Sequence, residues 1–110
     1  MALSGVHVAC GYVGGPRDDK GGASLARKPA WSQTMAAAGA TAQSAPSVSG
    51  RAGSPAFEIR ASIDVYVAIG ASPDASQANG SGDSARIFVP AGVTRNVFCD
   101  GGDKLAWVAA

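Results

Sequence analysis

The feature that most constrains the fold of this chain is a run of alternating apolar side chains in its second half. Every second position of the run is apolar: Phe57, Ile59, Ala61, Ile63, Val65, Val67 and Ile69. Because successive side chains of a β-strand point to opposite faces, a period of two predicts extended structure with one face buried. The run is long for a single strand, so we expect a bend or tight turn near Ser62–Asp64.

The rest of the second half has the pattern of short strands separated by turns. A polar loop, residues 71–84, follows the alternating run. Three short strands come after it, each bounded by glycine, proline or aspartate: residues 86–89, 93–99 and 104–109. Short strands with turn signals between them predict an all-β fold, a small antiparallel β-sandwich or barrel.

The first half is rich in Gly, Ala, Ser and Pro and holds few large apolar side chains, so we expect the core to come mainly from the second half. Residues 6–13 alternate and predict one strand, at a sheet edge or in an arm. For residues 31–45 we expect extended or irregular structure, since Gly39 and Thr41 oppose the helical propensity of the preceding alanines. We therefore divide the chain into an extended N-terminal arm and loop, residues 1–30, and a β-sandwich domain, residues 31–110.

The expected arm has a consequence for assembly. A segment with so little apolar area does not offset the entropy of ordering it. The main-chain groups of its strand need a sheet edge, and a neighbouring subunit offers one. We expect the arm to become ordered only in an assembly, and a chain that begins at Ala30 to fold without it.

The charge balance bears on the classes of partner. Residues 1–55 carry five basic and two acidic side chains, and residues 56–110 carry four and six, which gives +3 and −2 and a net charge of +1. This balance argues against a dedicated nucleic-acid binder. No stretch has the length and apolarity of a membrane span, and the start of the chain lacks the pattern of a signal peptide. We expect neither a nucleic acid nor a membrane as partner.

Candidate reactive residues are few. His7 is the single histidine, and a nucleophile such as Cys99 or a serine would need it as base; a strand histidine that faces solvent or an interface is the better interpretation. Cys10 and Cys99 leave a disulfide open, but we favour two unpaired and mostly buried thiols. The sequence shows no zinc spacing, and the loop that begins at Asp74 has Ala85 where a calcium loop needs an acid. We predict no catalytic residue, no cofactor and no metal site.

Several short motifs lie between about Ser32 and Ala109: a Thr/Ala/Ser lead-in at 34–44, Ile63–Gly70 with the Ala71-Ser72-Pro73 loop, Ile87–Gly92 and Gly102–Ala106. Together they resemble the small virion proteins of tailed bacteriophages. Such proteins are β-sandwiches with capsid cement, decoration or head–tail accessory roles. The resemblance implies a non-enzymatic structural protein of the capsid, assembled in the cytoplasm of a bacterial host, whose partners are the major capsid protein and copies of itself.

Burial of apolar and main-chain surface between subunits would be the mechanism, because whatever binds only the assembled state stabilises it. Candidate interface residues are apolar or aromatic and lie in the expected strands or beside them: Val6, Val8, Tyr12, Trp31, Tyr66, Phe88 and Phe98. Trp107 is a further contact candidate. Phe88 and Phe98 are out of register with the other large residues of their strands, which favours exposure.

Three alternatives stay open. The first is a head–tail joining or tail accessory protein with the same fold. The second is a small hydrolase that uses Cys99 or a serine. The third is a host- or carbohydrate-binding β module, which would need Tyr66 and Trp107 together on an exposed platform.

Overall fold

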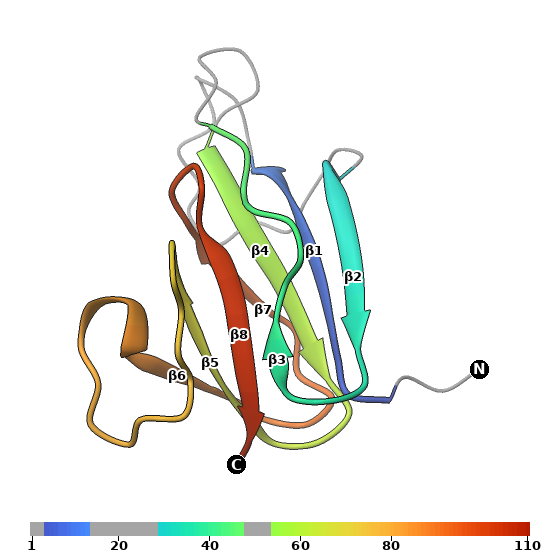
Figure 1. The fold of residues 1–110 in the computed structure, drawn as a ribbon. Coiled ribbons are helices and arrows are strands. Elements are labelled where there is room, and N and C mark those ends of the chain that lie inside the picture. Colours follow the sequence, from blue (N-terminus) through green and yellow to red (C-terminus); the bar gives the residue numbers. More distant parts are fainter. Residues whose placement is uncertain (1–3, 14–28, 48–53) are drawn as a thin grey trace.

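The computed structural model describes residues 4–13, 29–47 and 54–110, which form two antiparallel sheets packed face to face (Figure 1). Sheet A has the strand order β2 (Trp31–Met35), β1 (Val6–Val13), β4 (Ser54–Ala61), β7 (Arg95–Phe98). Sheet B has the order β3 (Gly39–Ala40), β8 (Lys104–Ala109), β5 (Val65–Gly70), β6 (Arg86–Val89). A short 3-10 helix, η1 (Gly82–Ser84), precedes β6. The predicted all-β sandwich is confirmed.

The alternating run of the second half supplies one strand to each sheet. β4 ends at Ala61 and β5 begins at Val65, so the expected turn lies at Ser62–Asp64 and carries the chain from sheet A to sheet B. Ile63, in this turn, is largely exposed. Apolar residues on either side of the turn keep the same parity and face the same core.

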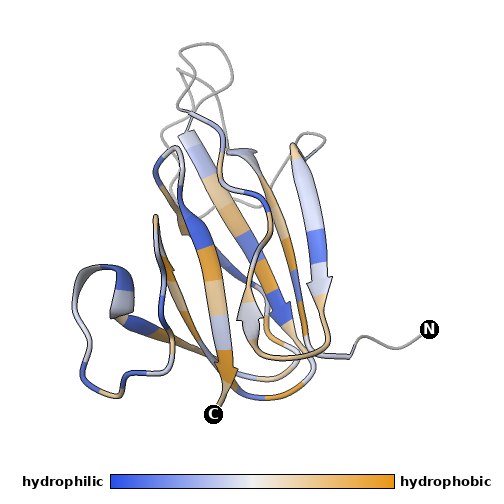
Figure 2. Cartoon of the chain, in the orientation of Figure 1, coloured by the Kyte–Doolittle hydropathy of each residue, from blue (hydrophilic) through white to orange (hydrophobic). Residues whose placement is uncertain are grey.

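The core lies between the two sheets and takes side chains from both (Figure 2). Phe57 is fully buried, and its ring meets Trp31 edge to face with centroids 6.0 Å apart. The other large residues without solvent exposure are aliphatic: Ile59, Leu105, Val6, Val8, Val65, Val67 and Val89. Burial of each such side chain contributes about 1.5–3 kcal/mol before entropy is counted.

The N-terminal strand is the main departure from the sequence-based expectation. β1 pairs with β2 on one side and with β4 on the other, so it is an interior strand of sheet A, neither an arm nor an edge. Its main-chain groups find their partners within the same chain, and no neighbouring subunit is needed to order it. A chain that begins at Ala30 would lack this strand, which argues against its folding alone, and the expectation stays a prediction. Residues 1–3, 14–28 and 48–53 lie outside the described residues, and so does the loop part of the predicted arm.

Residues 31–45 are extended or irregular, as expected. They include β2 and β3, which lie in different sheets. Thr41, just after β3, is buried, and its hydroxyl donates to the carbonyl of Gln43 and accepts from the amide of Leu105. The bond from Leu105, with a second one that the Thr41 amide donates to the Leu105 carbonyl, fixes the crossing segment against β8.

Candidate binding surface

The outward face of sheet B carries a cluster of three apolar or aromatic side chains and one arginine, which we call the aromatic patch: Tyr66, Arg86, Phe88 and Val108. Tyr66 lies between Phe88 of β6 and Val108 of β8 in the register of the sheet. The Tyr66 and Phe88 rings meet edge to face, with centroids 5.6 Å apart and planes at 61°. The guanidinium carbon of Arg86 lies 3.9 Å from the centre of the Tyr66 ring, a cation–π distance.

The aromatic patch is open because the 71–84 loop covers only the neighbouring part of the face. Ala75 of this loop packs on Ala68 and Ala106, and all three are buried. Arg86 marks the boundary, since one of its Nη atoms donates to the carbonyl of Ala75 at 3.3 Å. Beyond this boundary Phe88 is 43% exposed. The patch therefore presents a ring and a positive charge that are both held in place by neighbours.

The loop is held in shape by Asp74. Its carboxylate accepts hydrogen bonds from the amide and hydroxyl of Ser76, at 3.0 and 2.6 Å, and from the side-chain amide of Gln77, at 3.2 Å. These bonds lower the pKa of Asp74. At the other end of the loop the amide of Ser72 donates to the Asp83 carboxylate at 3.0 Å.

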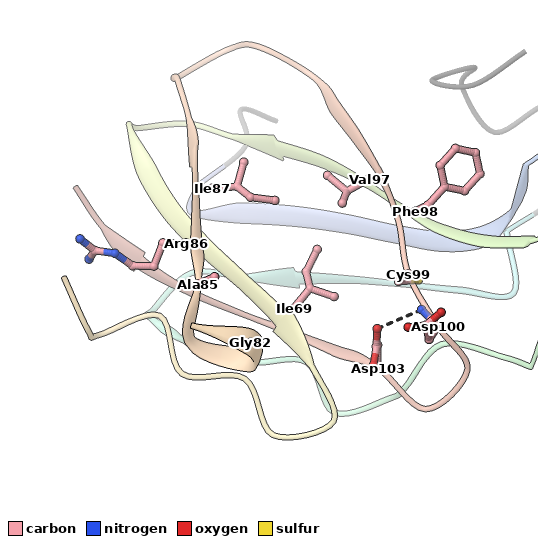
Figure 3. Close-up of a pocket in the computed structure, with 10 residues that line it drawn as sticks. All are labelled: Ile69, Gly82, Ala85, Arg86, Ile87, Val97, Phe98, Cys99, Asp100 and Asp103. Carbon is pink, nitrogen blue, oxygen red and sulfur yellow. Dashed lines mark hydrogen bonds between the residues drawn. The ribbon is translucent and has the colours of Figure 1, made fainter. Parts of the chain in front are cut away.

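The side of the sandwich where β6 and β7 lie contains a cleft of about 370 Å³ (Figure 3). Its apolar lining comes from Ile69, Ile87 and Val97, which are partly buried against the core. Ile87 and Val97 point toward each other from the two sheets. Asp100 and Asp103 lie at one end of the cleft, where the Asp103 carboxylate accepts from the Asp100 amide at 2.9 Å. Sequence reasoning did not find this cleft, although the parity of its three aliphatic residues was available.

The predicted interface residues have three different environments. Val6 and Val8 are fully buried in the core, so their assignment to an interface was wrong: an interior strand turns these side chains inward. Tyr12 and Trp31 are partly buried, and each donates a side-chain hydrogen bond to a main-chain carbonyl, to Ser47 and Ser44 respectively.

The remaining three predicted interface residues reach the surface. Tyr66 and Phe88 come together in the aromatic patch, as described above. Phe98, which is 50% exposed, lies on the outward face of sheet A, whereas Tyr66 and Phe88 belong to sheet B. The exposure of Phe88 and Phe98 was expected from their register, and their role as contacts stays a prediction.

The carbohydrate-binding alternative required Tyr66 and Trp107 on one surface, and the hydrolase alternative that uses Cys99 required His7 beside it; the structure separates both pairs. Trp107 pairs with Val67 on the inward side of sheet B and is buried, whereas Tyr66 is on the outward side, so they form no common platform. His7 lies on the outward side of sheet A, where Nδ1 is 2.7 Å from the hydroxyl of Thr34. Cys99 lies in the core, on the other side of the sheet.

Both thiols are free and buried, as the sequence interpretation favoured. Contact with Cys10, burial and the nearby Asp103 and Asp100 carboxylates raise the pKa of the Cys99 thiol. Among residues 4–13, 29–47 and 54–110 there is no group of three His, Cys, Asp or Glu residues placed to hold a metal ion. The same part of the chain contains no helix with the length and apolarity to cross a membrane.

Comparison with known proteins returned no matching family model, no matching curated protein and no matching solved structure.

Proposed function

We propose that this chain is a non-enzymatic structural protein of a tailed-bacteriophage virion, which binds the capsid surface and copies of itself and stabilises the assembled head. The observation that carries the proposal is the aromatic patch. Tyrosine, phenylalanine and arginine are enriched where proteins bind one another, and lysine and glutamate are depleted there. The patch has this composition, and it lies on one flat sheet face.

The side chains of the aromatic patch are already held in fixed positions, which favours binding. The edge-to-face contact fixes the Tyr66 and Phe88 rings, and Arg86 is fixed by its contacts with Tyr66 and with the carbonyl of Ala75. Side chains that are already ordered lose less entropy when a partner covers them. If capsid subunits bury these groups only after they have assembled, the chain binds only the assembled capsid, and mass action then stabilises the particle.

The same fold would serve a head–tail joining or tail accessory protein, and copy number separates the two. Cement proteins are present in hundreds of copies, whereas a joining ring has about six or twelve because it closes around one axis. Mass spectrometry of particles purified from an induced culture of the source organism would give the ratio of this chain to the major capsid protein. Absence of the chain from such particles would overturn the proposal.

The role of the aromatic patch is tested by a matched pair of variants. Phe88→Asp places a charge in the patch, and Ile63→Asp places the same charge on a residue of similar exposure in the β4–β5 turn. We expect Phe88→Asp to reduce binding to particles stripped of this chain by at least about tenfold, and Ile63→Asp to leave it nearly unchanged. Equal binding by both variants would show that attachment uses another surface.

A further inference from the structure

The open side of the sandwich has no role assigned so far. There β6 is the edge strand of sheet B and β7 is the edge strand of sheet A. Each strand has a partner on one side only, β5 for β6 and β4 for β7, among the described residues. An unpaired edge is a template for another strand, and proteins usually guard it with proline, a bulge or an inward-pointing charge. Neither strand contains proline, and the single inward-facing charge in them is Arg95.

The two edges are arranged so that one symmetry operation could pair both of them. Ile87 is the inward residue near the middle of β6, and Val97 has the same place in β7. They face each other across the cleft (Figure 3). A twofold axis perpendicular to the sheets, passing just outside both residues, reverses strand direction and keeps each sheet in its layer. It would therefore set β6 antiparallel to the partner's β6 and β7 antiparallel to the partner's β7.

We propose that two copies of this chain associate through the β6–β7 side about this twofold axis, so that the four strands of each sheet continue into those of the partner. The interface is isologous, which is the commonest form of association between identical chains. It closes the apolar cleft, because Ile87 and Val97 of each copy meet the same residues of the other and cover Ile69, which lies one strand further in. It also pairs the free main-chain groups of both edges.

The register set by the axis brings complementary groups together on the outward face. Antiparallel pairing centred on Ile87 places Arg86 opposite the partner's Phe88, since the two positions are one residue to either side of the centre. Directly opposite residues have side chains close enough to interact. The Arg86 guanidinium already lies over the Tyr66 ring, and the partner's Phe88 would add a second aromatic neighbour.

The inward face is complementary in charge. Arg95, an exposed residue, begins β7, whereas Asp100 and Asp103 follow its end at the mouth of the cleft. Pairing centred on Val97 places Arg95 opposite the partner's Cys99, beside the partner's Asp100 and Asp103. The twofold axis repeats this contact, so two positive and four negative side chains converge in two clusters. Opposite charges placed in this way fix the register of an interface and exclude others.

The loop between the strands also fits the arrangement. Residues 90–94 join β6 to β7, and the turn after β4 holds this loop, since Gly92 donates to the Ala61 carbonyl and Ala91 to the Asp64 carboxylate. Val93 of this loop is 44% exposed. The antiparallel register puts it next to the partner's Gly101, at the open end of the partner's cleft.

This inference rests on the self-association that the proposed function includes and names the surface for it, but the two are tested by different experiments. The test uses the isolated full-length chain, so a monomer in solution would overturn the dimer without affecting the copy number in particles. Conversely, absence from particles would leave the dimer intact.

Sedimentation velocity over a range of concentrations gives the oligomeric state directly. We expect a dimer, and we expect Arg95→Glu to raise the dimer dissociation constant by at least about tenfold because it opposes like charges at both clusters. Arg60→Glu is the matched control: it makes the same charge change at an exposed residue of β4, away from the open side. A monomer at every concentration overturns the proposal, as does a dimer that both variants affect equally.

A cross-link tests the register itself. In Ile87→Cys the new thiol lies beside the axis and opposite its copy, since the Cβ atoms of directly opposite residues in antiparallel strands are about 4.5–5.5 Å apart. Mild oxidation with a low-molecular-weight disulfide should link two copies by thiol–disulfide exchange, which releases the reduced thiol of the reagent. Ser32→Cys, on the opposite edge strand β2, should stay monomeric on a non-reducing gel. Equal cross-linking of both variants, or none at position 87, contradicts the register.

Discussion

Replacing Phe57 with alanine measures how far the sandwich depends on the inward face of sheet A. Phe57 is fully buried, contacts the Trp31 ring edge to face and pairs with Val97 in the sheet. Removal of a buried phenylalanine ring costs about 3–5 kcal/mol, from the lost transfer free energy and the cavity left behind. A domain of 110 residues has a free energy of unfolding of about 5–16 kcal/mol, so the variant loses a large share of its stability.

The matched control is Phe98→Ala, the same substitution on the adjacent strand of the same sheet. Phe98 pairs with Ala56 on the outward face and is half exposed, so we expect it to cost less than about 1.5 kcal/mol. Urea unfolding of each variant, followed by tryptophan fluorescence at a concentration that favours the monomer, gives both values. Because the slope is about 1–3 kcal/mol/M, the midpoint of Phe57→Ala should fall by about 1 M or more. Equal losses for the two variants would refute the register of sheet A and the core built on it.

Two further predictions concern backbone conformation and thiol chemistry. Gly5 has φ +88°, and a Cβ there would overlap the last carbonyl oxygen of β2, so Gly5→Ala should lower the free energy of unfolding by about 3 kcal/mol or more. Gly92 has φ +76° with open space around it, so Gly92→Ala should lower it by about 1–2 kcal/mol. Thermal melts of the two variants will compare these losses. Cys10 and Cys99 are buried, so a thiol reagent should modify them slowly in the native chain and at once in denaturant. Rapid labelling of either thiol in the native chain would contradict their burial.

The strands of the second half could be predicted from the alternating pattern, because a period of two gives both their extended conformation and the side that faces the core. The parity of Phe57 and Ile59 gives the buried face, and the same parity continues to Val65 and Val67 after the turn. The pattern does not state that the turn changes sheets. That follows from the packing of two faces, since both strands must turn their apolar side toward one core.

The position of β1 could not be predicted for a related reason. Its partner β4 begins 41 residues after β1 ends, and a period of two does not distinguish an interior strand from an edge strand. A low count of large apolar residues in the first half favoured an arm, but Val6 and Val8 are sufficient because they pack against residues that the second half supplies. A strand with few apolar residues of its own can still be interior when its neighbours provide the rest of the core.

The outward-facing residues of β6 and β7 show what the alternating pattern can indicate about contacts with partners. In β6 and β7 the inward residues Ile87 and Val97 could be assigned from their pairing with β5 and β4, which leaves Phe88 and Phe98 on the outside. An exposed phenylalanine on a strand whose inward positions are already apolar adds nothing to the core, so burial by a partner is the remaining source of stabilisation for it. The partly buried state of Ile69, Ile87 and Val97 adds what parity alone lacks, because it identifies the side of the sandwich whose core is incomplete. Exposed aromatic residues on the faces and an open apolar edge are therefore different signals: the first supports the proposed binding of a partner, and the second supports the proposed association of two copies of the chain.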